Sequence, residues 1–293
     1  MTDRTKFLGA SEIPAVLGIS PFKSPLDVYL EKTGRLVQNP PSIQMRAGNY
    51  LEPLVIALFE EETGIQVVNR QAHLTLKDHP FISATIDGQT TDGALVECKT
   101  TGFSQGWGEP ETDQVPDHVL VQCVQQMAVS GLSVVWIPVL IGRSDFRIYR
   151  VNRDEELEKM VIDRGIEFWE KNVLADMPPD PRTLEDVKKL FRVSRSEVVY
   201  ADAPMREAVC RLREIKTLIK GLEEEEKALL FRVQDGLRES DTLMSEGKIL
   251  VTWKTQDRTS LDQKILKEKY PDIFSECSKI SSSRVFRLAT AKE

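Results

Sequence analysis

The stretch TIDGQTTDGALVECKTTG, residues 85–102, places charged side chains inside a segment that otherwise has the pattern of buried strands. Its two D-G steps favour turns, so FISATID and ALVECK are expected to be consecutive strands. Asp87 ends the first strand, and the period of two puts Glu97 and Lys99 on one face of the second. Burying charge is costly unless the charges are paired or bind a metal ion. Any fold of this chain must therefore neutralise these three groups.

Two interpretations of this cluster are open from the residues alone. Asp87, Glu97 and Glu52, the last on a predicted helix, would form an all-oxygen site suited to Mg²⁺ or Mn²⁺. Lys99 would then orient or deprotonate a metal-bound water, or stabilise charge on a scissile phosphate. The alternative is a buried salt bridge between Lys99 and Glu97 or Asp87. The local pattern favours neither interpretation over the other.

Composition excludes several classes of protein. The chain has 293 residues, of which 41% are hydrophobic, and no apolar run approaches the length of a membrane span. Its N-terminus MTDRTKFLG lacks the pattern of a secretory signal. The four cysteines, at positions 98, 123, 210 and 277, are far apart and indicate neither a zinc site nor a disulfide framework. We therefore expect reduced thiols and a cytoplasmic location, with no membrane partner.

The net charge of −7 is divided unevenly along the chain. Residues 1–180 contain 16 Lys and Arg against 26 Asp and Glu, whereas residues 181–293 contain 23 against 20. No basic arm is evident, so DNA binding cannot be argued from overall charge. The acidic first part is compatible with a divalent-cation site, although a solvated acidic surface is the safer interpretation for most of these side chains.

Periodicity predicts an alternation of helices and strands. Helices are expected in SEIPAVLG, with Ser11 as N-cap, in SPLDVYLEKTG, in SIQMRAGNYLEPLVIALFEEETG, around DHVLVQCVQQMAVSG and in NRDEELEKMVIDRGIEFWEKNVLAD. Further strands are expected in IQVVNRQ, HLTLKD, SVVWIPVLIG and FRIYRV. The Pro-rich MPPDPRTLED predicts a boundary near residues 177–185. A charged helix with heptad-like apolar spacing follows, and then a tail of strand, loop, helix and a last strand at RVFRL.

Several motifs occur together in a particular order: RTKFLGASEIPAVLG, RAGNYLEPLVIALFEEETG, ISATIDG, VECKT and LVQCVQQM. Together they resemble the YqaJ-like viral recombinase family, which includes the phage lambda exonuclease, within the PD-(D/E)XK nuclease superfamily. The tail resembles the extension of longer phage and prophage members. The resemblance implies an α/β nuclease core with a mixed central sheet flanked by helices at residues 1–178. A linker with a charged helical or coiled-coil arm (179–240) and a small α+β extension (241–293) would follow.

The resemblance also implies roles for individual residues of a catalytic centre. Asp87 and Glu97 match the metal-binding acids, and the backbone carbonyl of Cys98 is a further expected ligand. Lys99 matches the catalytic lysine. The remaining matches are the helix carboxylate Glu52, also a possible metal ligand, and Gln122 on the helix after the strand pair. Two ions, Mg²⁺ or Mn²⁺, are expected in each site.

A second implied site holds the 5′ phosphate of a DNA end. Arg4 and Ser11 match an R-x(6)-S element, and Thr85 matches a hydroxyl residue of that pocket. An arginine offers bidentate bonds to phosphate. Three positions depart from the family pattern: Ile86 replaces a proline, Val124 replaces the second glutamine of Q-x-Q, and Gln105 replaces a basic phosphate contact.

The implied function is Mg²⁺-dependent 5′-to-3′ hydrolysis of double-stranded DNA from 5′-phosphorylated ends, leaving 3′ single-stranded overhangs for recombination. Implied partners are duplex DNA ends, a single-strand annealing protein of the RecT/Beta type, and further copies of the chain in a ring-shaped trimer. The host would be a bacterial cell carrying the phage or prophage. Two alternatives are an endonuclease or helicase-linked nuclease of the same superfamily, and a non-catalytic scaffold that binds DNA ends.

Overall fold

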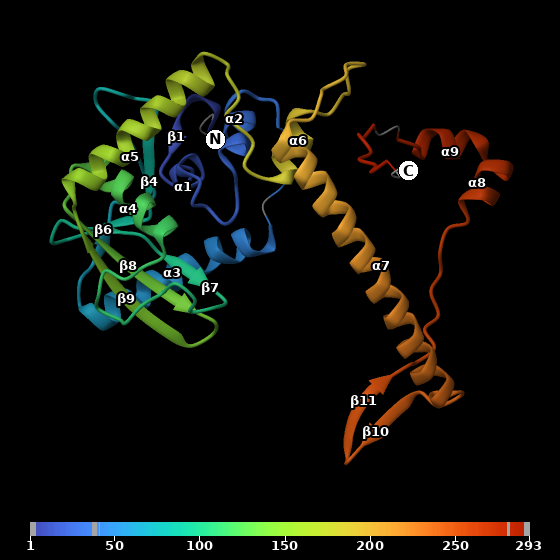
Figure 1. The fold of residues 1–293 in the computed structure, drawn as a ribbon. Helices are drawn as coiled ribbons and strands as arrows, with labels where there is room; N and C mark the ends of the chain where they lie inside the picture. The colour runs from blue at the N-terminus through green and yellow to red at the C-terminus, as the bar shows by residue number, and fades with distance from the viewer. Residues whose placement is uncertain (1–3, 37–39, 41, 280–281, 290–293) are drawn as a thin grey trace. The chain divides into compact units, whose positions relative to one another are not determined.

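The computed structural model of the chain describes all residues except 1–3, 37–39, 41, 280–281 and 290–293. The chain forms two compact units, residues 1–190 and 191–293 (Figure 1). The first unit therefore extends past residue 178, where the sequence placed the end of the core. In the described part of the chain, none of the helices is both long enough and apolar enough to span a membrane.

The first unit alternates strands and helices along the chain. Its strands are β1 (Leu8–Gly9), β2 (Val67–Val68), β3 (Ala72–Thr75), β4 (Ile82–Ile86), β5 (Gly88–Thr90), β6 (Leu95–Val96), β7 (Lys99–Thr101), β8 (Val134–Ile141) and β9 (Asp145–Asn152). Its helices are η1 (Arg4–Lys6), α1 (Ile13–Leu17), α2 (Pro25–Lys32), α3 (Ile43–Thr63), α4 (Asp117–Ser130), α5 (Glu155–Phe168), the π-helical turn η2 (Trp169–Leu174) and α6 (Leu184–Leu190).

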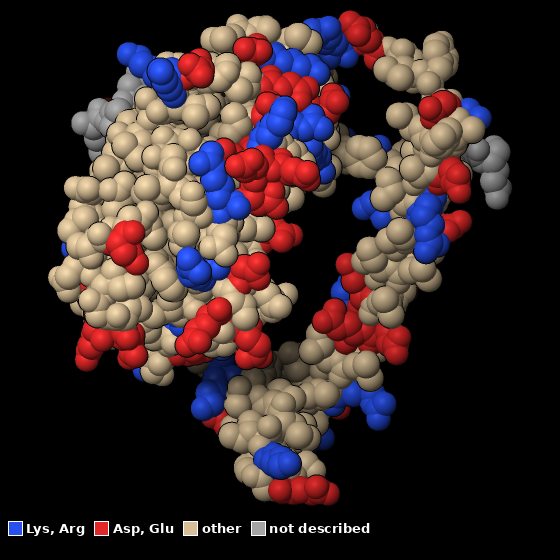
Figure 2. Space-filling model, turned by 90° about the vertical axis from the view of Figure 1, so that its left-hand side faces the viewer, with Lys and Arg blue, Asp and Glu red and all other residues tan. Residues whose placement is uncertain are grey.

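The second unit contains a long helix, a hairpin and two short helices. These are α7 (Ala203–Leu237), β10 (Thr242–Ser245), β11 (Lys248–Thr252), α8 (Gln263–Lys269) and α9 (Pro271–Cys277). Acidic side chains gather on the part of α7 that leads to the hairpin (Figure 2). The strand predicted at RVFRL is wrong, because residues 282–289 contain no strand.

The strands of the first unit form two sheets. One has the order β1-β4-β3, and the other has the order β2-β5-β6-β8-β7, with β9 paired to β8. Both contain parallel and antiparallel neighbours: β1 is parallel to β4, and β6 and β7 are parallel to β8. The chain passes from the first sheet to the second between Ile86 and Gly88, so Asp87 lies where the two sheets join.

Helices cover both faces of the larger sheet. Alternation along β8 separates two sets of side chains. Val135, Ile137 and Val139 are fully buried in the main core with residues of α4, and α4 in turn packs against α1 and α5. On the opposite face, the Trp136 ring lies 6.0 Å from the ring of Phe59 on α3. The expected α/β class, a mixed sheet flanked by helices, is confirmed.

Most helix ends lie where the sequence indicated. Ser24 caps α2 through a reciprocal capping box with Asp27, and Pro25 occupies the first turn. Ser42 caps α3, and Gly64 ends it in the left-handed conformation. These residues supply the hydrogen bonds and backbone freedom that helix ends require, which is why they were visible from sequence alone.

The predicted role of Ser11 as a helix cap is wrong. Helix α1 begins at Ile13, and Glu12 occupies the N-cap position without a side-chain cap bond. The Glu12 N–H donates to the Gly9 carbonyl at 2.9 Å, and the Gly9 N–H donates to the Glu12 carboxylate at 2.9 Å. Residues 9–12 therefore form a closed turn, and Ser11 is an exposed residue of that turn.

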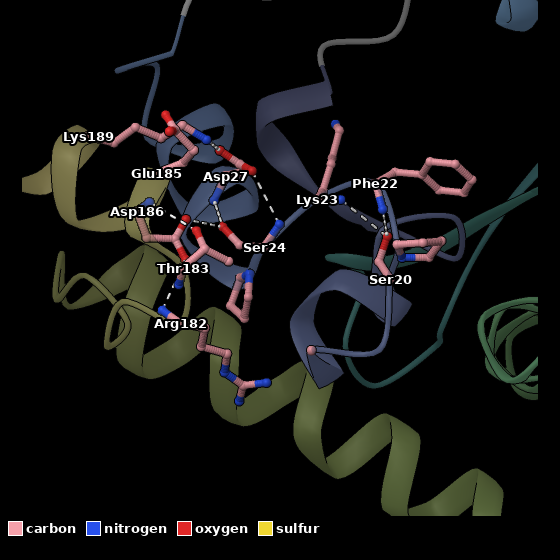
Figure 3. Close-up of a pocket in the computed structure, with 13 residues that line it drawn as sticks. Ser20, Phe22, Lys23, Ser24, Asp27, Arg182, Thr183, Glu185, Asp186 and Lys189 are labelled. Atoms are coloured by element: carbon pink, nitrogen blue, oxygen red, sulfur yellow. Dashed lines mark hydrogen bonds and ion pairs between the residues drawn. The ribbon is translucent and has the colours of Figure 1, made fainter. Parts of the chain in front are cut away.

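The Pro-rich segment after residue 176 attaches to the first unit through α2. The Ser24 hydroxyl donates to Asp186 at 2.7 Å, and the backbone N–H groups of Arg182 and Thr183 donate to the same carboxylate. These residues line a cavity of about 370 Å³ between the loop before α2 and α6 (Figure 3). The cavity contains none of the predicted site residues, and its Asp186 is committed to holding the segment in place.

A buried ion pair joins the N-terminal elements. The Lys32 ammonium on α2 donates to the Glu12 carboxylate at 2.8 Å and to the Arg4 carbonyl at 2.7 Å. The side chains of Lys32 and Glu12 are 1% and 8% exposed. Burial lowers the pKa of Lys32, and the Glu12 charge opposes that shift. Removal of either partner would leave the other charge buried without compensation, which destabilises the fold.

We predict that Lys32→Ala lowers the free energy of unfolding by about 3–5 kcal/mol, because it leaves the Glu12 carboxylate buried without a cation. Chemical denaturation at pH 7 measures this effect. Lys23→Ala is the matched control, since Lys23 is 43% exposed in its ion pair with Glu31 and should cost less than about 1 kcal/mol. Equal losses for the two variants would contradict the prediction.

Candidate active site

The strand predicted to carry Glu97 and Lys99 is interrupted at its centre. The pairings Val96↔Trp136 and Lys99↔Val139 keep one register along β8, so β6 and β7 are two parts of one line. The Glu97 N–H donates to the Trp136 carbonyl at 2.9 Å. In a parallel ladder the Glu97 carbonyl would next accept from residue 138, but Pro138 has no N–H. The ladder therefore breaks at Glu97 and Cys98.

Asp87 occupies the space beside this break. The β5–β6 pairing of Gly88 with Val96 places Asp87 across from Glu97 when the register is extended by one residue. An Asp87 carboxylate oxygen accepts the Cys98 N–H at 2.8 Å. In extended backbone the N–H and C=O of one residue point to the same edge. The Cys98 carbonyl is therefore expected on the Asp87 side of the strand.

Glu97 is held by three side chains. Its Oε1 accepts from the Lys99 ammonium at 2.6 Å and from Gln122 Nε2 at 2.6 Å, and its Oε2 accepts from Gln126 Nε2 at 2.5 Å. Lys99 also donates to Gln122 Oε1 at 2.9 Å. The four residues form one hydrogen-bonded cluster between the interrupted strand and α4. The salt bridge that the sequence left open is therefore present.

The surroundings of Asp87 disfavour the charged form of its carboxyl group. Burial, followed by the Glu97 charge, raises the pKa of Asp87 to about 8. Burial alone would lower the pKa of Lys99, but the Glu97 charge and hydrogen bond outweigh it and raise that pKa. Burial and the neighbouring carboxylates raise the pKa of the Cys98 thiol, which is therefore neutral. Of the groups on Cys98, the backbone carbonyl is the oxygen donor available to a hard cation.

Glu52 lies within electrostatic reach but is engaged elsewhere. Its charge contributes to the raised pKa of Asp87, and its Oε1 accepts from Gln71 Nε2 at 2.7 Å. Among the residues that the structure describes, no group of three or more His, Cys, Asp and Glu side chains is arranged to bind a metal ion together. The oxygen donors that fit a divalent cation are thus the Asp87 and Glu97 carboxylates and the Cys98 carbonyl. The metal role of Glu52 stays a prediction.

The residues predicted to bind a terminal phosphate are linked by a chain of contacts. Arg4, Ser11 and Thr85 are all exposed. The Lys32 ammonium donates to the Arg4 carbonyl and to the carboxylate of Glu12, which follows Ser11 in the sequence. The same ammonium lies 5.7 Å from the centre of the Phe7 ring.

Contacts on the adjoining sheet continue this chain to the third residue. The Phe7 ring lies 4.9 Å from the His73 ring, and His73 Nδ1 lies 3.3 Å from Thr85 Oγ1. Gln105, which stands where a basic residue was expected, is exposed in a turn after β7. The N-terminal segment with Arg4 therefore lies on the same side of the unit as Thr85.

Sequence reasoning missed two participants. Gln126 is one helical turn after Gln122, so the i, i+4 spacing puts both amides on the face toward Glu97. That spacing was a usable signal in LVQCVQQM. The contact of His73 with Thr85 follows from the antiparallel β3–β4 register, in which the two residues are opposite. In the sequence, a single histidine in a short strand does not indicate which residue it will contact.

The site is thus an acid pair and a lysine at a broken strand of a mixed α/β core, and comparisons with known proteins show what the chain is similar to. Residues 1–133 match the model of the YqaJ-like viral recombinase domain. These residues, somewhat under half of the chain, are therefore similar to that domain. The chain is 28% identical over 295 residues to the Bacillus subtilis (strain 168) protein YqaJ, described as uncharacterized, and the match covers 98% of this chain and 92% of that protein.

Two solved structures with similarity to this chain are described as exonucleases. An alkaline exonuclease from Laribacter hongkongensis matches with a TM-score of 0.49 and 20% identity over 59% of this chain and 90% of that one. A phage-related exonuclease from Haemophilus somnus matches with a TM-score of 0.41 and 11% identity, over 58% and 96% of the two chains.

We predict that Asp87→Asn makes the metal-free protein less sensitive to pH. Between about pH 4 and pH 8, Asp87 is ionised in the unfolded chain but protonated in the folded one, so stability of the wild type falls as the pH rises and levels off above pH 8. The asparagine variant should lose this decline, which is on the order of a few kcal/mol. Urea denaturation in chelator across this range measures it. Asp78→Asn, at an exposed position, is the control and should keep the wild-type slope.

Proposed function

We propose that the chain is a metal-dependent deoxyribonuclease that degrades duplex DNA from 5′ ends. The observation that supports this proposal best is the meeting of Asp87, Glu97 and Lys99 at the break in β6–β7. A buried carboxylate pair with a raised Asp87 pKa favours a bound cation, and the available donors are all oxygen, which suits Mg²⁺ or Mn²⁺. Two ions per site are part of the proposal.

A bound divalent ion would supply Lewis-acid stabilisation of the scissile phosphate and an activated water. Asp87, Glu97 and the Cys98 carbonyl would hold it. Within the chain itself, Lys99 carries the only charge of opposite sign in this hydrogen-bonded cluster of described residues. Its raised pKa keeps the ammonium protonated, so Lys99 would stabilise negative charge on the phosphate rather than act as a base. Gln122 and Gln126 would keep Glu97 in position.

The 5′-end preference is the second part of the proposal. Arg4, Ser11 and Thr85 would bind the terminal phosphate, with Arg4 supplying charge-assisted bonds. The contacts through Lys32, Phe7 and His73 support a common location for Arg4 and Thr85. The product would be a 3′ single-stranded overhang, the form that a single-strand annealing protein of the RecT/Beta type would bind during phage recombination.

Lys99→Ala is expected to lower Mg²⁺-dependent digestion of linear duplex DNA by about 10²–10³-fold, because the cationic group beside the acid pair is lost. DNA binding, measured by gel shift in Ca²⁺, should change less than about threefold. Lys77→Ala, on an exposed loop, is the matched control and should digest normally. Undiminished digestion by the Lys99 variant would exclude the catalytic role.

Digestion of a linear duplex labelled at one end tests the direction of degradation. A substrate with a 5′ phosphate should lose the 5′-end label first and faster than one with a 5′ hydroxyl. Arg4→Ala should reduce that preference about tenfold or more, while Arg143→Ala, in the exposed turn after β8, should not. Cleavage of closed circular DNA would favour the endonuclease alternative, and binding of ends without any cleavage would favour the scaffold.

A further inference from the structure

The proposed phosphate site has little positive charge for the ligand that it would bind. A terminal phosphate monoester carries about −1.5 to −2 charges at pH 7. Of Arg4, Ser11 and Thr85, only the arginine is charged. Lys32 lies nearby, but its ammonium donates to the Glu12 carboxylate and to the Arg4 carbonyl, and its side chain is 1% exposed. A second accessible cation would therefore complete the site.

His73 lies beside Thr85 on the smaller sheet. Strands β3 and β4 are antiparallel, and His73 is directly opposite Thr85 in their register. Both side chains are exposed, and His73 Nδ1 lies 3.3 Å from Thr85 Oγ1. Residues directly opposite in an antiparallel pair share one face of the sheet. An anion that reaches the Thr85 hydroxyl therefore also reaches the imidazole.

The other neighbour of β4 brings Ser11 to the same place. Strand β1 is parallel to β4, and Gly9 pairs with Ser83. Beyond Gly9 the chain enters the closed turn that carries Ser11, toward the end of β4 at which Thr85 lies. Thr85 is therefore flanked by His73 on one side and by the Ser11 turn on the other.

Phe7 links the imidazole to the segment that contains Arg4. The Phe7 ring lies 4.9 Å from the His73 ring and 5.7 Å from the Lys32 ammonium. Burial is the main cause of the lowered pKa of Lys32, and the Arg4 charge adds to it, so the Arg4 guanidinium lies within electrostatic reach of that ammonium. Arg4 and His73 are thus both close to the contact of Lys32 with Phe7. The ring contact also limits rotation of an exposed imidazole, which reduces the entropy lost on binding.

The contact between His73 and Thr85 leaves a donor for a ligand in either direction. If Nδ1 donates to Oγ1, the hydrogen of the Thr85 hydroxyl is free to donate. If Nδ1 accepts from the hydroxyl, Nε2 carries the ring hydrogen and is free to donate. The doubly protonated imidazole leaves both donors available and adds a positive charge, which strengthens hydrogen bonds to an anion.

We propose that His73, paired with Thr85, binds the 5′-terminal phosphate of a DNA end and supplies the second cationic contact beside Arg4. The inference rests on the proposed preference for 5′ ends and adds a residue to that site. In the bound state, His73 Nδ1–H donates to Thr85 Oγ1, while the Thr85 hydroxyl and His73 Nε2–H both donate to phosphate oxygens. His73 would therefore distinguish a phosphorylated end from a hydroxyl end and take no part in hydrolysis itself.

Binding of a hairpin duplex with one open end tests this role without cleavage. The duplex is labelled in its loop and carries a 5′ phosphate or a 5′ hydroxyl, and fluorescence anisotropy in Ca²⁺ gives the ratio of the two dissociation constants. The full-length wild type should bind the phosphorylated end about a hundredfold more tightly, about tenfold for each cationic contact. His73→Asn keeps a polar group near Thr85 but has none in place of Nε2. It should lower the ratio about tenfold and change binding of the hydroxyl end less than about threefold.

His73→Arg should keep the ratio within about threefold of the wild type, because the guanidinium supplies the cation. A residue that only held Thr85 in place would give the reverse order, with asparagine tolerated and arginine not. His79→Asn is the matched control. His79 also contacts an aromatic ring, that of Phe81, but it lies before the other end of β4 and its replacement should leave the ratio unchanged.

Two further outcomes would overturn the inference, and they can be told apart. If Arg4→Ala lowers the ratio while His73→Asn keeps the wild-type value, the phosphate site stands without His73. If the wild type binds the two ends equally, the 5′-phosphate site of the proposed function fails together with the role of His73.

Discussion

The bond from the Cys98 N–H to the Asp87 carboxylate, 2.8 Å long, is the contact on which the candidate site depends. It joins Asp87, where the chain passes from the smaller sheet to the larger one, to the interrupted strand at Cys98. Without it the Cys98 N–H would lack a ladder partner at a part-buried position, since β5 no longer runs beside it. Asp87 is thus both a structural acceptor and the carboxylate whose pKa is raised most clearly by its surroundings.

The parts of the fold that local chemistry determines could be predicted from the sequence. Helix ends with a capping serine or a terminal glycine, as at Ser24 and Gly64, lie where they were expected. The final strand and the Ser11 cap were wrong for a related reason. Both were inferred from short segments, where apolar alternation or one hydroxyl residue is compatible with several conformations and tertiary contacts decide between them.

The site was predictable in its residues but not in its geometry. Period two placed Glu97 and Lys99 on one face, and their 2.6 Å contact agrees with that. The break beside them depends on Pro138, some forty residues later on another strand, which denies the Glu97 carbonyl a donor. Only the β6–β8 register reveals this effect, because nothing in VECKT marks the strand as interrupted.

The two readings of the acid–lysine cluster, ion pair and metal site, are compatible rather than exclusive. A carboxylate has about four lone-pair positions. Glu97 Oε1 uses two of them, for Lys99 and Gln122, whereas Oε2 accepts one bond, from Gln126. Oε2 therefore keeps a lone pair for a cation while Oε1 retains the lysine. The same carboxylate can hold the ammonium beside the scissile phosphate and contribute to a metal site, which explains why Lys99 and the acids lie so close together.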